Sequence, residues 1–105
     1  MEKIAGVDFL ATAEAELLEA IEWYNKRNEG LGFEFAAEVL RTIHRIIDNP
    51  QAWPALSKRS RRCGTNRFPF AVIYQTRQER VLIVSIMHMR REPNSWRSRL
   101  PLRNQ

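Results

Sequence analysis

Residues that could hold or cleave a phosphodiester gather near the end of the chain. The stretch 88–99 follows an apolar run and contains one histidine, four arginines and one tryptophan. Arginine presents a planar fork of donors to a phosphate or a carboxylate, and histidine can transfer a proton near neutral pH. His88 has the same strand parity as Val84 and Ile86, so its side chain is expected on a defined face of a sheet. We therefore interpret this stretch as a functional site rather than a solvated tail.

Other catalytic arrangements are missing from the sequence. It has no glycine-rich phosphate loop and no paired-histidine metal spacing. His44, the only histidine besides His88, is expected to be a partly exposed packing residue. The one cysteine, Cys63, cannot form an internal disulfide and has no second cysteine for a thiolate metal site. The sequence thus predicts no metal, no cofactor and no small-molecule substrate.

Basic residues are concentrated in the second half of the chain. Of 105 residues, 17 are Lys or Arg and 12 are Asp or Glu, which gives a formal net charge of +5. Residues 1–50 contain five cationic and ten anionic side chains, whereas residues 51–105 contain twelve and two. Such a surface favours an anionic partner. The N-terminus carries acidic residues, unlike a secretory signal, and the longest apolar run, 81–84, is too short to span a membrane. The sequence therefore predicts a cytoplasmic protein with no membrane span.

The helical period predicts two helices, at about 11–28 and 33–48. Gly30 and Gly32 lie between them and favour a tight turn, and Asn49-Pro50 ends the second helix. Glu38 is expected on the solvated outer face of that helix, near Arg41. The expected inward stripe is Phe33, Ala36, Val39 or Leu40, Ile43, and Ile46 or Ile47.

Apolar and β-branched runs predict four strands, at about 3–8, 61–67, 70–75 and 81–87. The expected fold is a single α+β domain over residues 1–105, in the order β-α-α-β-β-β. Both helices should pack on one face of a mainly antiparallel sheet, and a short C-terminal helix should begin near Pro93. The pattern does not specify the order of the strands in the sheet.

The expected core lies between the helices and the sheet. It comprises Phe33, Leu40, Ile43, Val72 and Val84. The last two strands supply large apolar side chains to both sheet faces, and two helices can cover only one face. We therefore expect the other face to be open, and a partner to bind across it and the arginine-rich edge.

The ordered set of motifs resembles the RelE/ParE superfamily of toxins from type II toxin–antitoxin systems, also called plasmid stabilization proteins. The resemblance is strongest to the ParE-like branch. It rests on Glu22-Trp23-Tyr24, Leu31-Gly32 with Phe35, Asn49-Pro50 with Trp53-Pro54, Arg61 to Phe70, Ile73-Tyr74, and the closing His88, Arg90-Arg91, Pro93 and Trp96-Arg97.

The resemblance implies a growth-inhibiting toxin that a cognate antitoxin neutralises. ParE-like members poison DNA gyrase by binding, whereas RelE-like members cleave mRNA on the ribosome and commonly use a C-terminal proton-transfer residue. Trp96 cannot transfer a proton, which favours the binding branch, although His88 could serve as acid or base in a ribonuclease. A third alternative is a non-toxic basic interaction module. The residues expected to bind the target are Arg61, Arg62, Arg67, His88, Arg90, Arg91, Trp96 and Arg97.

Overall fold

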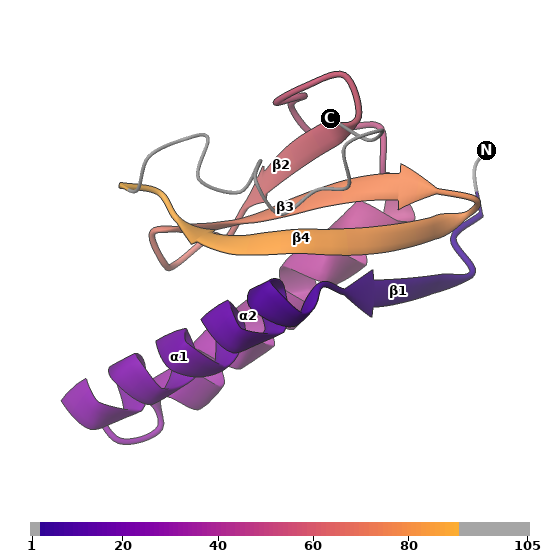
Figure 1. The fold of residues 1–105 in the computed structure, drawn as a ribbon. Coiled ribbons are helices and arrows are strands. Elements are labelled where there is room, and N and C mark those ends of the chain that lie inside the picture. Colours follow the sequence, from indigo (N-terminus) through magenta and orange to yellow (C-terminus); the bar gives the residue numbers. More distant parts are fainter. Residues whose placement is uncertain (1–2, 91–105) are drawn as a thin grey trace.

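The computed structural model describes residues 3–90 and confirms the expected α+β fold and element order. Its elements are β1 (Gly6–Phe9), α1 (Ala11–Arg27), α2 (Leu31–Asp48), β2 (Ser60–Gly64), β3 (Phe70–Arg77) and β4 (Arg80–His88). Both helices lie on one face of the four-stranded sheet (Figure 1). The expected C-terminal helix lies outside the described residues, as do Arg91, Trp96 and Arg97.

The sheet has the strand order β1-β4-β3-β2. The pairs β2–β3 and β3–β4 are antiparallel, and β1 pairs with β4 in parallel, so the sheet is mainly antiparallel as expected. The hairpin between β3 and β4 turns at Gln78 and Glu79, whose φ angles are 52° and 63°. A two-residue turn with both φ angles positive matches the right-handed twist of paired strands.

The two helices form an antiparallel hairpin that turns at Gly30. This glycine has a φ of 88°, which a residue with a side chain rarely adopts. The amide of Gly32 then donates to Asn25 Oδ1 at 2.6 Å, and a Cβ on Gly32 would meet the Ile21 carbonyl oxygen. The predicted turn is confirmed, and α2 begins two residues earlier than expected because Leu31 and Gly32 already belong to it.

The face that α2 turns to the sheet differs from the expected one. Phe33 is 69% exposed and Leu40 is 56% exposed, so placing both in the core was wrong. The buried stripe is Phe35, Val39, Thr42, Ile43 and Ile46, and it also includes the carboxylate-bearing Glu38, which was expected outside. Two apolar stripes run along α2 with the same period, and the one that contains Phe35 is buried because Phe35 packs against the rings of Phe68 and Phe70.

A β-bulge in β4 changes which face its last residues occupy. Tyr74 pairs with Ile83 and Ile73 pairs with Ser85, so Val84 has no partner on β3. Val84, the bulged residue, lies on the face away from the helices, whereas Ile86 after it packs in the helix-side core. His88 therefore shares a face with Ile86, as expected, but not with Val84. An inserted residue reverses the alternation of side chains.

The sheet face away from the helices carries its own small apolar cluster. Ile73, Val84 and Met87 pack there, beside Leu56 and Leu82. Ile73 and Val84 have no exposed surface. Val84 is thus buried, but not between the helices and the sheet, and the expectation of an open apolar face is wrong.

Two strand boundaries also differ from the expected ones. β1 begins at Gly6, and β2 ends at Gly64, before Arg67. The hydroxyl of Thr65 donates to the carbonyls of Phe68 and Phe70 at 2.7 and 3.0 Å, which curls residues 65–69 into a loop. Neither helix in residues 3–90 combines the length and apolar character that a bilayer span requires.

Candidate functional site

A groove of about 400 Å³ lies between α1 and the end of β4. One wall comes from α1 and the other from β3, β4 and the residues beside them. Its lining is Glu16, Glu19, Ala20, Trp23, Tyr24, Pro69, Phe70, Ile86, His88 and Arg90. The acidic side chains thus come from the helix wall and the basic ones from the strand wall, and each wall also supplies aromatic rings.

Glu16 attaches α1 to the edge of β4. β1 pairs with β4 only up to Ile83, so the β4 backbone beyond that point has no strand on this side. The Glu16 carboxylate accepts hydrogen bonds from the Ile86 amide and the Ser85 hydroxyl, each at 3.0 Å. A carboxylate therefore takes the place of the missing strand and fixes the groove wall.

His88 is held in the groove by a ring contact and a backbone hydrogen bond. Its ring packs edge-on against Phe70, with ring centroids 5.0 Å apart, because the two residues are paired across β3 and β4. Its Nδ1 accepts a hydrogen bond from the Arg90 amide at 3.1 Å. Neutral His88 therefore carries its proton on Nε2.

Aromatic rings form the floor and one rim of the groove. Tyr24 contacts Phe70 and, deeper, Phe35 and Phe68 in the core. Trp23 is 49% exposed, and the Arg27 guanidinium lies over its ring, 3.4 Å from the ring centroid. A half-exposed tryptophan beside a groove is a typical anchor for a bound chain.

Arg61 and Arg62 are placed apart from the groove. Arg61 donates to the Trp53 carbonyl at 2.7 Å and to Gln51 Oε1 at 2.9 Å, so it fastens the loop before β2. Because side chains alternate along a strand, Arg62, opposite Ile73, projects to the face away from the helices. The structure therefore does not bring this pair to His88.

Arg67 and Arg90 differ in their surroundings. Arg67 forms an ion pair with Glu34 at 2.9 Å and stacks over Phe68, which fixes its loop to α2. Arg90 is exposed and lines the groove with His88. Of the expected residues that the structure describes, only His88 and Arg90 meet at one site.

Burial raises the pKa of two tyrosines and of the cysteine. It raises the pKa of Tyr24 and of Tyr74, so both hydroxyls stay protonated near neutral pH. The Tyr74 hydroxyl donates a hydrogen bond to the Pro50 carbonyl at 2.6 Å and has a structural role. Burial also raises the pKa of Cys63, which disfavours the thiolate. Within residues 3–90, no group of three or more His, Cys, Asp or Glu side chains is placed to hold a metal ion.

Sequence reasoning missed the helix wall of the groove. Trp23, Tyr24 and Phe70 were not among the residues expected to bind the target, and neither were Glu16 and Glu19. A usable signal was the position of Glu16, which lies on the same helical stripe as the buried Ala13 and Ala20. A carboxylate in a buried stripe indicates a specific partner.

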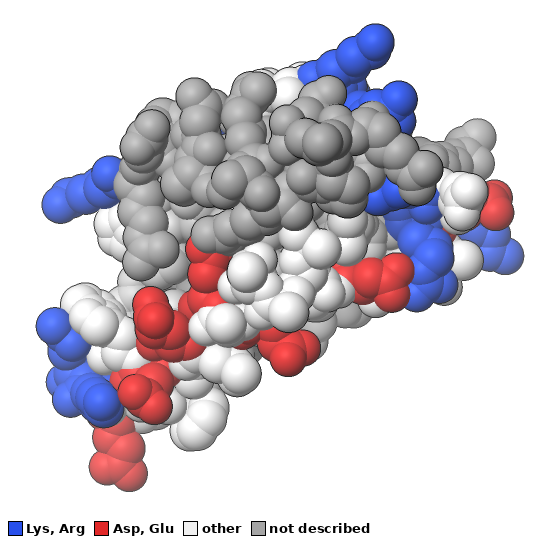
Figure 2. Space-filling model, in the orientation of Figure 1, with Lys and Arg blue, Asp and Glu red and all other residues white. Residues whose placement is uncertain are grey.

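Figure 2 shows how charge is divided over the surface, with acidic side chains gathered over α1 and basic ones beside the start of β1 and at the far end of α1. The groove belongs to the acidic part, through Glu16 and Glu19 on α1. The basic part beside β1 lies at the opposite end of β4, where the β3–β4 hairpin turns. The molecule thus presents two separate surfaces of different chemistry.

Comparisons with known proteins agree with this fold. A family model described as the ParE toxin of the type II toxin–antitoxin system parDE matches residues 7–93. A solved structure, the chromosomal ParDE toxin–antitoxin system from P. aeruginosa, superimposes with a TM-score of 0.69 and 15% sequence identity. The match covers 79% of this chain and 94% of that chain, and it shows a shared fold. No curated protein matches the sequence.

Proposed function

The chain belongs to the ParE toxin family of type II toxin–antitoxin systems, and we propose that it inhibits growth by binding DNA gyrase, until a cognate antitoxin neutralises it. The family match covers the described fold from β1 to β4. We further propose that residues 1–105 act as one domain in the cytoplasm, where the target is found.

The groove between α1 and β4 is the observation that supports binding rather than catalysis. A ribonuclease needs cations placed around a scissile phosphate, next to a proton-transfer group. Arg61 and Arg67 instead bind neighbouring protein groups, and Arg90 is the one arginine within residues 3–90 that lines the groove with His88. The aromatic lining provides apolar contact area of the kind that anchors a protein partner.

We place the antitoxin in this same groove. An apolar segment could lay its side chains over Trp23, Tyr24 and Phe70, and its acidic residues would meet Arg90. The cluster on the other sheet face is already buried and offers no comparable surface. Binding of the peptide from the neighbouring open reading frame should weaken as salt increases, because part of it is electrostatic.

The decisive experiment compares growth, DNA supercoiling and transcript integrity. The full chain should stop growth when expressed alone and should be harmless with the neighbouring reading frame. It should inhibit gyrase supercoiling in vitro while transcripts stay intact. If transcripts are cut while supercoiling is normal, the protein is an RelE-like endoribonuclease, and if growth is unaffected, it is a non-toxic module.

Two variants sharpen this comparison. His88→Gln keeps much of the size and hydrogen bonding of the side chain but removes its titration, so a binding toxin should lose little activity. Arg90→Ala or Arg91→Ala removes a charge-assisted contact and should relieve toxicity. The reverse pattern, with cleavage lost in the first variant and kept in the others, would identify a ribonuclease.

A further inference from the structure

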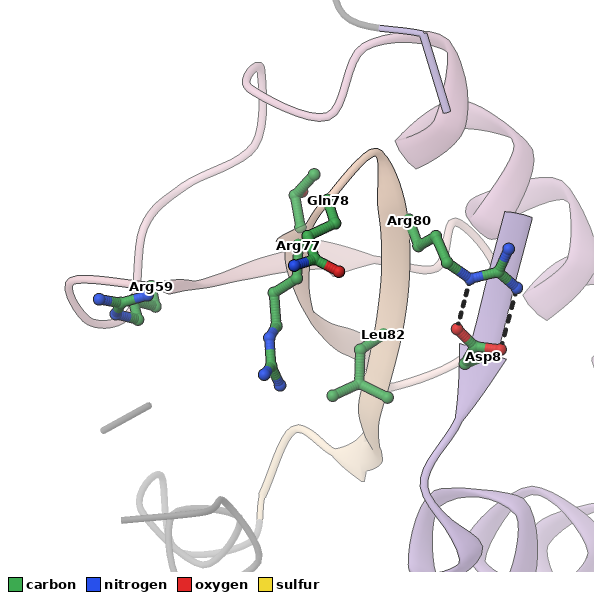
Figure 3. Close-up of a pocket in the computed structure, with 7 residues that line it drawn as sticks. Asp8, Arg59, Arg77, Gln78, Arg80 and Leu82 are labelled. Atoms are coloured by element: carbon green, nitrogen blue, oxygen red, sulfur yellow. Dashed lines mark hydrogen bonds and ion pairs between the residues drawn. The ribbon is translucent and has the colours of Figure 1, made fainter. Parts of the chain in front are cut away.

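A large basic hollow lies at the hairpin end of the sheet, at the other end of β4 from His88. It has a volume of about 890 Å³. Its lining is Asp8, Arg59, Thr76, Arg77, Gln78, Arg80 and Leu82. Figure 3 shows Arg77 and Leu82 projecting the same way from β3 and β4, with Arg59 apart from them beside the start of β2.

The three arginines in this hollow are not equivalent. Arg80 forms a two-pronged ion pair with Asp8 on β1, with distances of 2.8 and 3.0 Å (Figure 3). This contact lowers the pKa of the Asp8 carboxyl, so the pair is ionised at neutral pH. Within residues 3–90, neither Arg59 nor Arg77 forms an ion pair. Two guanidinium groups therefore remain available to an external anion.

A second, smaller hollow adjoins the first. It has a volume of about 210 Å³ and includes Ser57, Lys58, Ser60 and Arg61. Arg59, Thr76 and Arg77 line both hollows and so stand between them. A ligand that carries repeated charges could contact both hollows at once, whereas a single phosphate would occupy only a small part of this space.

We propose that this basic surface binds the sugar–phosphate backbone of a nucleic acid, independently of the proposed gyrase target. The lining offers guanidinium, ammonium, hydroxyl and amide donors, which are the groups that contact phosphates. Among the described lining residues, most are charged or polar and the apolar ones are Leu82, Ala55 and the ring of Tyr74, so an acidic peptide would find few contacts for apolar anchors. Contacts to phosphate and sugar carry no sequence information, so binding is expected to be independent of base sequence.

The test measures fluorescence anisotropy of labelled single-stranded oligonucleotides of two unrelated sequences. Both should bind with similar affinity, and log K should fall linearly with log salt. Arg59→Ala with Arg77→Ala should weaken binding by about tenfold or more and make the salt slope shallower by about 1.4, since each lost phosphate contact on a single strand contributes about 0.7.

Matched controls separate this surface from net charge. Arg77→Ala and Lys26→Ala each remove one positive charge, but Lys26 lies near the end of α1 with Glu22 as its partner. Only the Arg77 variant should lose several-fold in affinity. Equal losses would overturn the proposal, because they would show that any cation of the chain serves as well.

A gain of affinity provides an independent test. Asp8→Asn should release Arg80 and tighten oligonucleotide binding by about fivefold, since it adds a free guanidinium and removes a repelling carboxylate. Glu22→Gln makes the same charge change away from the hollow and should have little effect. Unchanged affinity in the Asp8 variant, or efficient displacement of the oligonucleotide by poly-glutamate at equal charge, would contradict the proposal. Thermal melts confirm that each variant is folded.

Discussion

The carboxylate of Glu38 accepts a hydrogen bond from the backbone amide of Asn66 at 2.7 Å, across 28 residues of sequence. Its other oxygen accepts one from Arg41 at 3.0 Å. The side chain is buried, and these bonds fix the loop 65–69 to α2. The loop also carries Pro69, which lines the groove and accepts a hydrogen bond from the Met89 amide.

Glu38→Gln should destabilise the protein at neutral pH and less so in acid. The Asn66 hydrogen bond, with Arg41 nearby, holds the pKa of Glu38 below its usual value. The stability this group adds is therefore complete above the ordinary glutamate pKa and is lost as pH falls through the lowered one. We expect a loss of about 1 to 3 kcal/mol at pH 7. Urea melts of both proteins at pH 7 and pH 3 should show the gap closing, and a constant gap would contradict the assignment.

The orientation of α2 can be tested with two neighbouring apolar residues. Ile43 is buried at 6% exposure and Leu40 is 56% exposed. Ile43→Ala should cost about 2 to 5 kcal/mol through lost contacts and a cavity. Leu40→Ala should change the free energy of unfolding by about 0.5 kcal/mol or less. Denaturant melts measure both, and a larger loss at Leu40 would mean that the other stripe faces the sheet.

Gly32 should tolerate no side chain, because the two helices approach closely there. A Cβ would meet the Ile21 carbonyl oxygen, which is backbone and cannot move aside cheaply. Gly32→Ala should therefore cost about 2 kcal/mol or more, despite the better helix propensity of alanine. Gly64→Ala is the control, since a Cβ there has no atom within 4 Å. Equal melting temperatures for the two variants would exclude the close approach.

Trp23 should contribute to partner binding more than to stability. Trp23→Ala removes a half-exposed anchor of the groove and should weaken antitoxin binding by at least about tenfold. Leu18→Ala is a suitable control, because Leu18 is 60% exposed on α1 and does not line the groove. Isothermal titration with the antitoxin peptide gives the affinities. If only the Leu18 variant lost affinity, the antitoxin would bind elsewhere on α1.

The structure confirms the predicted features whose signal is local in the sequence. Gly30 allows the tight turn between the two helices because it can adopt a positive φ, and Asn49-Pro50 ends the second helix. The hairpin of β3 and β4 follows from two β-branched runs around a polar turn. Each of these features depends on neighbouring residues, so the sequence pattern was enough.

The site could not be predicted in the same way. Arg61 and Arg67 look like binding residues in the sequence, yet in the fold Arg61 donates a hydrogen bond to the Trp53 carbonyl and Arg67 forms an ion pair with Glu34. Arg59 and Arg77 do not stand out among eleven arginines of the second half, and only their shared hollow distinguishes them. Whether a charged side chain is free depends on what lies beside it in space.

By itself, the sequence determined the type and order of the elements, the helical hairpin and the segregation of charge between the two halves. The tertiary structure decided which stripe of α2 is buried, which strand lies beside β4, and on which face His88 lies after the bulge at Val84. Periodicity is a local property: it tells which residues of one helix or strand share a face, but not which other element that face contacts. Asp8 and Arg80 meet because a parallel pairing joins segments 72 residues apart, and no local pattern encodes that pairing.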